Sequence, residues 1–148
     1  MKKESNKDMS ADIKLDRISV TRAVFEDNED FKPGDTLPVD FNFDVSKDFN
    51  EDKTLLRVRE RLDVDFPGIK PPFNLQVAVE GVFHVDNPQH ANQLEQFADV
   101  GAPAVLFPYL REVADAITGK SRFPRLTLPL INFGLAAEEK KAQKGKRS

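Results

Sequence analysis

Between residues 39 and 83 the chain contains three stretches in which apolar and polar residues alternate. They run from Val39 to Val45, from Leu56 to Phe66 and from Phe73 to Phe83. A period of two places successive side chains on opposite faces of a strand, which is typical of antiparallel strands with one buried face. A fourth strand-like stretch, residues 12–25, changes phase, and we expect a bulge near residues 16–17 to reconcile its two halves.

Charges on the polar faces predict how these strands pair. One consistent register places Asp44 opposite Arg57 and, between the next two strands, Arg59 opposite Glu80. Opposite charges directly across a sheet contribute ~0.2–1 kcal/mol each. The arginines at 57, 59 and 61 are therefore expected on a solvent face that neighbouring acids neutralise. Glu60 alone breaks the apolar face of its strand, and we expect it at an interface or at the sheet margin.

After residue 85 the pattern changes from strands to helices. Apolar residues recur at helical spacing over residues 88–101 and again over residues 104–118. Pro108 lies inside the second stretch, where it should kink the helix or mark its start. Residues 123–133 are too rich in proline for a helix and too apolar for a free loop. The order predicts an α+β domain, with a four-stranded antiparallel sheet followed by C-terminal helices.

Composition agrees with one domain. The chain has 148 residues, 39% of them hydrophobic and 32% charged, enough to bury roughly 70% of the surface of the unfolded chain. No run of ~18 apolar residues predicts a transmembrane helix, and the charged N-terminus leads into no apolar segment typical of a secretory signal. We expect a disordered arm over residues 1–11, a folded domain over 12–137 and a basic, disordered tail over 138–148; a short helix over residues 134–143 is the alternative at that end.

The net charge of −3 conceals a segregation of charge. Ten acidic residues between Glu26 and Asp52 stand against two lysines, so this segment carries −8 and the rest of the chain +5. The acidic segment contains Pro33-Gly34-Asp35, which signals a turn. Its acids do not follow the order of a calcium-binding loop.

Candidate chemistry is scarce. With no cysteine, the chain has no disulfide, no Cys-ligated zinc and no thiol nucleophile. Its only histidines, His84 and His90, match no metal-binding spacing, and neither a phosphate-binding loop nor a nucleophile elbow is present. We therefore expect no catalytic residue, no metal site and no cofactor. The arginine row lacks aromatic residues in its own phase, which argues against nucleic-acid binding.

Apolar residues outside the regular elements are the unusual feature of the chain. Phenylalanines border or lie in the acidic loop, and others lie in the proline-interrupted segment 123–133. One interpretation is that both segments simply cover the sheet. The other is that they form an apolar groove for an extended peptide, which would gain affinity from burial at ~25 cal/mol per Å² with little side-chain specificity.

Two motifs carry a resemblance to a known family. Residues 106–112 read Leu-Phe-Pro-Tyr-Leu-Arg-Glu, and residues 123–133 read Phe-Pro-Arg-Leu-Thr-Leu-Pro-Leu-Ile-Asn-Phe. Together they resemble the SecB protein-export chaperone family, and weaker similarity extends the match to about residues 12–134. The resemblance implies a cytoplasmic, ATP-independent holdase that needs no cofactor.

That resemblance also implies where partners bind. SecB-like proteins are homotetramers, built as dimers of dimers, and hold non-native polypeptides in long apolar grooves. The residues implied in peptide binding here are Phe25, Phe31, Tyr109, Phe123, Leu126, Leu128 and Phe133. Those implied in contacts between copies are Leu75, Val77 and Val79. The clients would be unfolded preproteins or antitoxin-like proteins, without nucleic-acid binding or direct membrane insertion.

Departures from the family concern the export partner. Export SecB proteins dock the ATPase SecA through acids on the exposed sheet face; here Glu26 matches, but Arg22 and Gln76 stand where acids are expected. Charge reversal at a docking patch costs several kcal/mol of binding. The sequence therefore leaves open a general export chaperone, a chaperone dedicated to one client such as an antitoxin, and a non-chaperone adaptor whose arginine-bearing face recognises an acidic partner.

Overall fold

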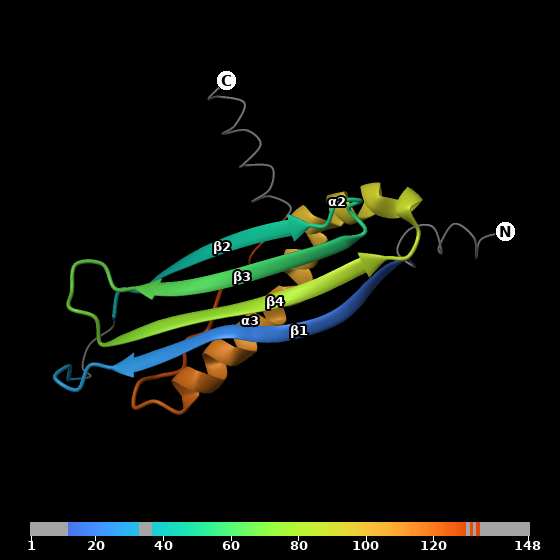
Figure 1. Ribbon diagram of the computed structural model, residues 1–148. Helices are drawn as coiled ribbons and strands as arrows, with labels where there is room; N and C mark the ends of the chain where they lie inside the picture. The colour runs from blue at the N-terminus through green and yellow to red at the C-terminus, as the bar shows by residue number, and fades with distance from the viewer. Residues whose placement is uncertain (1–11, 33–36, 130, 132, 134–148) are drawn as a thin grey trace, which may run out of the picture.

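The computed structural model describes residues 12–32, 37–129, 131 and 133. Our expectations for the arm 1–11, the turn at 33–35, the alternative helix 134–143 and the tail 138–148 lie outside these residues. Four strands form one antiparallel sheet in the order β1-β4-β3-β2 (Figure 1). They are β1 (Ile13–Asp27), β2 (Asp40–Phe49), β3 (Leu55–Asp65) and β4 (Phe73–Val85).

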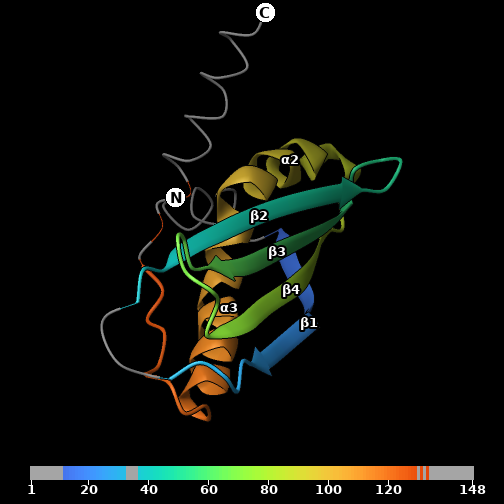
Figure 2. The ribbon, with the colours of Figure 1, turned by 90° about the vertical axis from the view of Figure 1, so that its left-hand side faces the viewer.

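The helices follow the sheet in sequence and pack on one of its faces, as Figure 2 shows. A 3-10 turn, η1 (Pro88–His90), leads into α2 (Ala91–Asp99), which is followed by α3 (Gly101–Gly119). Apolar side chains of β3 and β4 are buried against Leu94 of α2 and against Leu106 and Leu110 of α3, all three fully buried. This confirms the α+β fold class, with the four strands preceding the helices.

The register between β3 and β4 follows the charge pattern, whereas that between β2 and β3 does not. Arg59 lies opposite Glu80, as predicted. Asp44, however, lies opposite Arg61 rather than Arg57, a slip of four residues from the predicted pairing. The reason is that β2 continues to Phe49, so the hairpin turn occupies residues 50–54 and is shorter than expected.

Strand β1 contains the predicted bulge and a second one. The register shifts between Leu15 and Arg17 and again between Val20 and Arg22. Two shifts keep Leu15, Ile18 and Val20 on the helix-covered face, because their partners on β4 all belong to that face. β1 is an edge strand, and α2 and α3 cover it incompletely: Val20 is 52% exposed.

Helix α3 begins earlier than the periodicity predicts. It starts at Gly101 instead of residue 104, directly after α2, and Pro108 lies inside it without ending it. A Cβ atom at Gly101 would lie 2.3 Å from the ring of Phe97, so only glycine permits this close approach between the helices. None of the described helices is both long and apolar enough to cross a membrane.

Glu60 lies in the middle of the sheet and is fully buried, so the expectation that it sits at the sheet margin is wrong. Its strand, β3, is paired on both sides, and Glu60 has Val45 and Val79 as its lateral neighbours. Neither carboxylate oxygen has a hydrogen-bond partner among the described residues. Burial raises the pKa of Glu60 to about 8, because an apolar environment disfavours the charged form.

Candidate functional site

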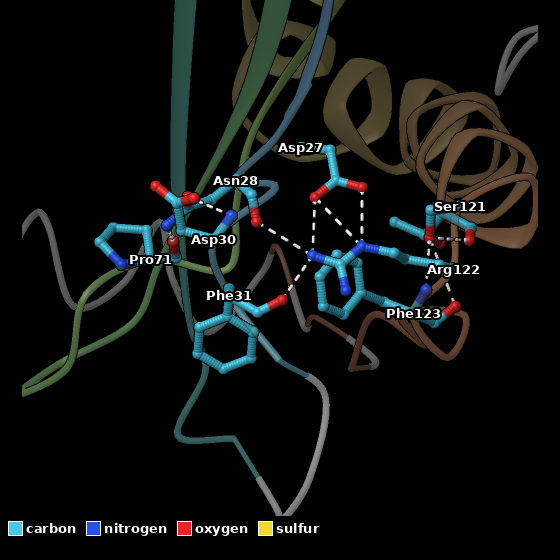
Figure 3. Close-up of polar contacts among 9 residues, drawn as sticks. Asp27, Asn28, Asp30, Phe31, Pro71, Ser121, Arg122 and Phe123 are labelled. Carbon is cyan, nitrogen blue, oxygen red and sulfur yellow. Dashed lines mark hydrogen bonds and ion pairs between the residues drawn. The ribbon is translucent and has the colours of Figure 1, made fainter.

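The end of β1 and the loop after α3 are joined by one arginine, Arg122 (Figure 3). Its Nε donates to Oδ2 of Asp27 at 2.9 Å, and its Nη2 donates to Oδ1 of the same carboxylate at 3.0 Å. Nη2 also donates to the backbone carbonyls of Asn28 (2.9 Å) and Phe31 (2.6 Å). The hydrogen bond with Asp27 raises the pKa of Arg122 further above its ordinary value. The guanidinium therefore stays charged and holds two distant segments together.

Asn28 turns the chain out of β1 and positions Phe31. Its backbone N–H donates to the carbonyl of Pro72 and its Nδ2 to that of Pro71, both at 3.0 Å. Its carbonyl accepts from the N–H of Phe31 (2.9 Å), and its Oδ1 accepts from that of Asp30 (3.3 Å). Asparagine favours such turns because its side chain bonds to the backbone two residues on. The bend brings the Phe31 ring toward the loop that follows α3.

Five aromatic rings fill the space beneath the Arg122 contact. The Phe31 and Phe123 rings are 6.1 Å apart, and Phe123 is 5.2 Å from Phe73. Phe73 in turn meets Phe25 at 5.2 Å and Phe66 at 5.1 Å. Stacked, tilted and edge-on pairs at these distances add ~0.5–1.5 kcal/mol each to the stabilisation that comes from burying their area. We call this contact between residues 25–31 and 121–128 the seam.

The far side of the seam is tied to the end of α3. Buried Thr118 donates from Oγ1 to the carbonyl of Ala114 (2.9 Å) and accepts from the N–H of Leu126 (3.0 Å). Ser121 donates from Oγ to the carbonyl of Thr118 at 2.6 Å and accepts from the N–H of Phe123 at 3.1 Å. The segment after α3 therefore leaves the helix in a defined direction, although residues 124–129 belong to no helix or strand.

The structure divides the predicted peptide-binding residues among three places. Phe25, Phe31 and Phe123 meet in the seam; Phe123 is buried there, while the other two are partly exposed. Phe133 packs instead on Phe107, with ring centroids 5.7 Å apart. Leu126 and Leu128 also belong to the seam, on its 121–128 side, and Leu128 is buried there. Their role in binding a peptide stays a prediction.

Tyr109 occupies the third place, a cleft between β1 and α3. The cleft is lined by Ile18, Ser19, Val20, Val79, Tyr109, Glu112, Val113, Ala116 and Ile117. Tyr109 is 45% exposed there, beside the exposed Val20 of the edge strand. The cleft is thus an open apolar surface, separate from the seam.

The residues predicted for contacts between copies and the residues at the predicted SecA-docking positions lie on opposite faces of the sheet. Leu75, Val77 and Val79 are fully buried inside this chain, on the face covered by the helices, and their part in a contact between copies stays a prediction. Arg22, Glu26 and Gln76 lie on the other, outer face. There Nε of Arg22 donates to Oε1 of Gln76 at 2.8 Å, and Glu26 is exposed.

Sequence reasoning missed the polar half of the seam. Nothing in the periodicity singles out Arg122 or Asp27, which are 95 positions apart. The available signal was a cation directly before Phe123, at the start of an otherwise apolar segment. Within the described residues, no group of three His, Asp or Glu side chains is placed to hold a metal ion.

Comparisons with known proteins agree on one family. The family model described as preprotein translocase subunit SecB matches residues 12–144. An uncharacterized protein of Methanocaldococcus jannaschii is 28% identical over 81% of this chain and 79% of its own length. The protein-export protein SecB of Paraburkholderia xenovorans is 38% identical over 51% of this chain and 48% of that protein. The chain therefore spans about half the length of the SecB relatives that it matches.

A solved structure has the same fold. It is a SecB-like chaperone of Mycobacterium tuberculosis in complex with a ChAD peptide from the antitoxin HigA1. The two chains align with a TM-score of 0.66 and 20% identity, over 87% of this chain and 98% of that chain.

Proposed function

Since the chain belongs to the SecB family, we propose that it is a chaperone, and that it binds non-native polypeptides as an ATP-independent holdase. The observation that carries the proposal is the seam, where Phe31 and Phe123, both outside the helices and strands, meet, and where Phe123 packs on Phe73. Partly exposed rings on a buried aromatic base provide apolar surface that a polypeptide can cover without sequence-specific contacts. The chain would act in the cytoplasm.

We place the client along the seam, above all along residues 124–129. These residues belong to no helix or strand, and their side chains are exposed except for the partly buried Leu126 and the buried Leu128. An extended polypeptide can pair with such a segment and cover Phe31, Leu126 and their neighbours. The hydrogen bond between Arg122 and Asp27 holds the two sides of the seam together. We therefore expect a bound client to disturb this hydrogen bond first.

Two kinds of client fit the proposal. The matching family model is described as a preprotein translocase subunit and several relatives are named protein-export proteins, so we favour unfolded preproteins as clients. The alternative is one dedicated client, as in the Mycobacterium tuberculosis chaperone whose structure contains an antitoxin peptide. Docking on SecA is the weaker part of the export proposal, because Arg22 and Gln76 take the places of acids on the outer face. A pull-down with SecA distinguishes a general export chaperone from a chaperone that serves one dedicated client.

We further propose that the chain assembles as a homotetramer, a dimer of dimers. Support comes from the exposed apolar surface along β1 and α3, which includes Leu15, Val20, Val105 and Tyr109, each more than a third exposed. An edge strand with unpaired backbone groups also favours pairing with another chain. Size-exclusion chromatography with light scattering tests this point, and a monomer at micromolar concentration would contradict it.

The holdase proposal is tested by the aggregation of heated citrate synthase, followed by light scattering. The wild-type chain is expected to suppress aggregation at stoichiometric amounts. Phe31→Asp together with Phe123→Asp should abolish suppression, because it places two charges in the seam. Since Phe123 is buried, Phe31→Asp alone, on a half-buried ring, is the variant that keeps its fold, and circular dichroism checks this.

Leu55→Asp is the matched control, because Leu55 is 40% exposed on the outer face of the sheet. It should suppress aggregation as well as the wild type. Failure of the wild-type chain to suppress aggregation would overturn the proposal. Equal suppression by folded Phe31→Asp and by Leu55→Asp would remove the seam as the binding site.

A further inference from the structure

The outer face of the sheet, on the side away from α2 and α3, carries five arginines arranged around β4. Arg17 of β1 and Arg57 of β3 both pair with Val82, so they stand on either side of it. Arg22 and Arg61 flank Ala78 in the same way. The fifth, Arg59, lies opposite Glu80, between these two rows. We call these five residues the arginine rows: Arg17, Arg22, Arg57, Arg59 and Arg61.

Carboxylates within the sheet neutralise the arginine rows only in part. Glu80 is shared by two of them, with its Oε1 at 3.4 Å from Arg17 and 3.5 Å from Arg57. Asp63 binds Arg61 at 2.8 Å. On β2, Asp44 and Asp48 lie opposite Arg61 and Arg57 in the register.

Two of the five arginines form no ion pair with any carboxylate of the described residues. Arg59 forms no ion pair with them, and Arg22 meets only the neutral amide of Gln76. The side chains of Arg17 and Arg57 are 60% and 57% exposed. The flanks of β4 therefore offer guanidinium groups to an external anion.

We propose that the arginine rows bind an acidic, extended segment of a partner protein that lies along β4. In a strand, alternate side chains repeat every ~6.6–6.8 Å, so carboxylates on every second residue of such a segment match the spacing of Arg57, Arg59 and Arg61. Guanidinium groups bind carboxylates through two parallel hydrogen bonds, which adds geometric specificity. This surface lies on the face opposite the seam, so the inference goes beyond the proposed holdase function.

The same face is poorly suited to nucleic acid. Glu80, Asp63, Asp44 and Asp48 are interspersed among the arginines and would repel a backbone that carries a charge at every nucleotide. The outward positions of the four strands hold no Phe, Tyr or Trp on which a base could stack. A polypeptide, by contrast, can space its carboxylates to match the arginines and avoid the acids.

Fluorescence anisotropy with a labelled 16-residue peptide of alternating Glu and Ser tests the proposal on the full chain. Arg22→Gln with Arg59→Gln removes two arginines without breaking any ion pair of the described residues. The matched control, Arg111→Gln with Lys120→Gln, removes the same charge from exposed positions of α3 and its C-cap. We expect the outer-face variant to bind about tenfold more weakly, and the control to change by less than about twofold.

Binding should weaken between 50 and 300 mM salt, because exposed charges are screened. Three results would overturn the proposal: no binding of the peptide by the wild type, equal loss in both variants, or tighter binding of an oligothymidine of equal charge. The outer-face variant should still suppress citrate synthase aggregation, so failure here is distinguishable from failure of the holdase proposal.

Discussion

Replacing Glu60 by Val should stabilise the fold, and the gain should depend on pH. Glu60 is fully buried with both carboxylate oxygens unpaired, and its lateral neighbours are Val45 and Val79. Val fills a similar volume, suits a strand and carries no polar atom. The substitution removes a buried acid and replaces it with a side chain like those beside it.

The size of the effect follows from the raised pKa. The pKa rises from 4.5 to about 8 on folding, so the folded state binds a proton that the unfolded state releases above pH 4.5. At pH 7, which lies roughly 2.5 units above the pKa of the unfolded state, this proton uptake destabilises the fold by about 3 kcal/mol. Below pH 4.5 the penalty disappears, because both states are protonated. Above about pH 8 it stops growing, because both states are ionised.

Urea unfolding at pH 5, 6, 7, 8 and 9, at one fixed protein concentration, measures the effect. The free energy of unfolding of wild type relative to Glu60→Val should fall by about 1.4 kcal/mol per pH unit between pH 5 and 8 and then level off. Glu60→Gln should remove the pH dependence but remain less stable than Glu60→Val, since its amide is still buried without a partner. Glu26→Val, on the exposed face of β1, is the control and should show no such slope.

A constant difference between wild type and Glu60→Val across pH 5 to 8 would refute the reasoning. It would mean that the carboxylate is equally solvated, or equally paired, in the folded and unfolded states.

Two further predictions concern contacts described above. Arg122→Ala and Asp27→Ala should each destabilise the fold, and a double-mutant cycle should give a favourable coupling between them, because the two side chains form a bidentate ion pair. A coupling near zero in urea unfolding would contradict the role of Arg122 in holding the two sides of the seam together. Gly101→Ala should lower the free energy of unfolding by about 1–3 kcal/mol, because the added Cβ would clash with the Phe97 ring. The double variant Gly101→Ala with Phe97→Leu should recover part of this loss. Thermal denaturation of the single and the double variant compares their stabilities.

The two hairpins show what a pattern of charges can and cannot predict. Between β3 and β4, Arg59 has a single suitable acid on the partner strand, Glu80, and the predicted register is confirmed. Between β2 and β3, acids at 44 and 48 both suit the arginine at 57, and a slip of four residues keeps every side chain on its own face. Periodicity therefore could not separate the two registers.

Turn chemistry decides the register between β2 and β3. The Oδ1 of Asn50 accepts from the N–H of Leu55 at 2.9 Å, and Thr54 donates to Asp52 at 2.6 Å. Lys53 adopts the left-handed conformation, with φ of 59°. These residues favour a turn over 50–54, but hydrophobic patterning carries no record of such local hydrogen bonds.

For the seam, the sequence indicated the two segments but not their packing. Phe31 and Phe123 were singled out as apolar residues outside regular elements, and the structure brings their rings together. That Phe123 is buried on Phe73 depends on where the segment after α3 leaves the helix, which the bonds of Thr118 determine. Neither composition nor periodicity reports the direction of a chain at a helix end.

The cleft between β1 and α3 contains the only tyrosine of a chain that has no tryptophan. Phenylalanine absorbs and emits at shorter wavelengths, so fluorescence excited beyond the phenylalanine absorption band originates at Tyr109 alone. The phenol is 45% exposed beside Val20, and any molecule that covers it changes its solvent environment. Tyr109 is thus an intrinsic fluorescent probe at one defined place, and it can follow assembly or binding at this cleft without a label. Binding at the separate seam is expected to leave the fluorescence of Tyr109 unchanged.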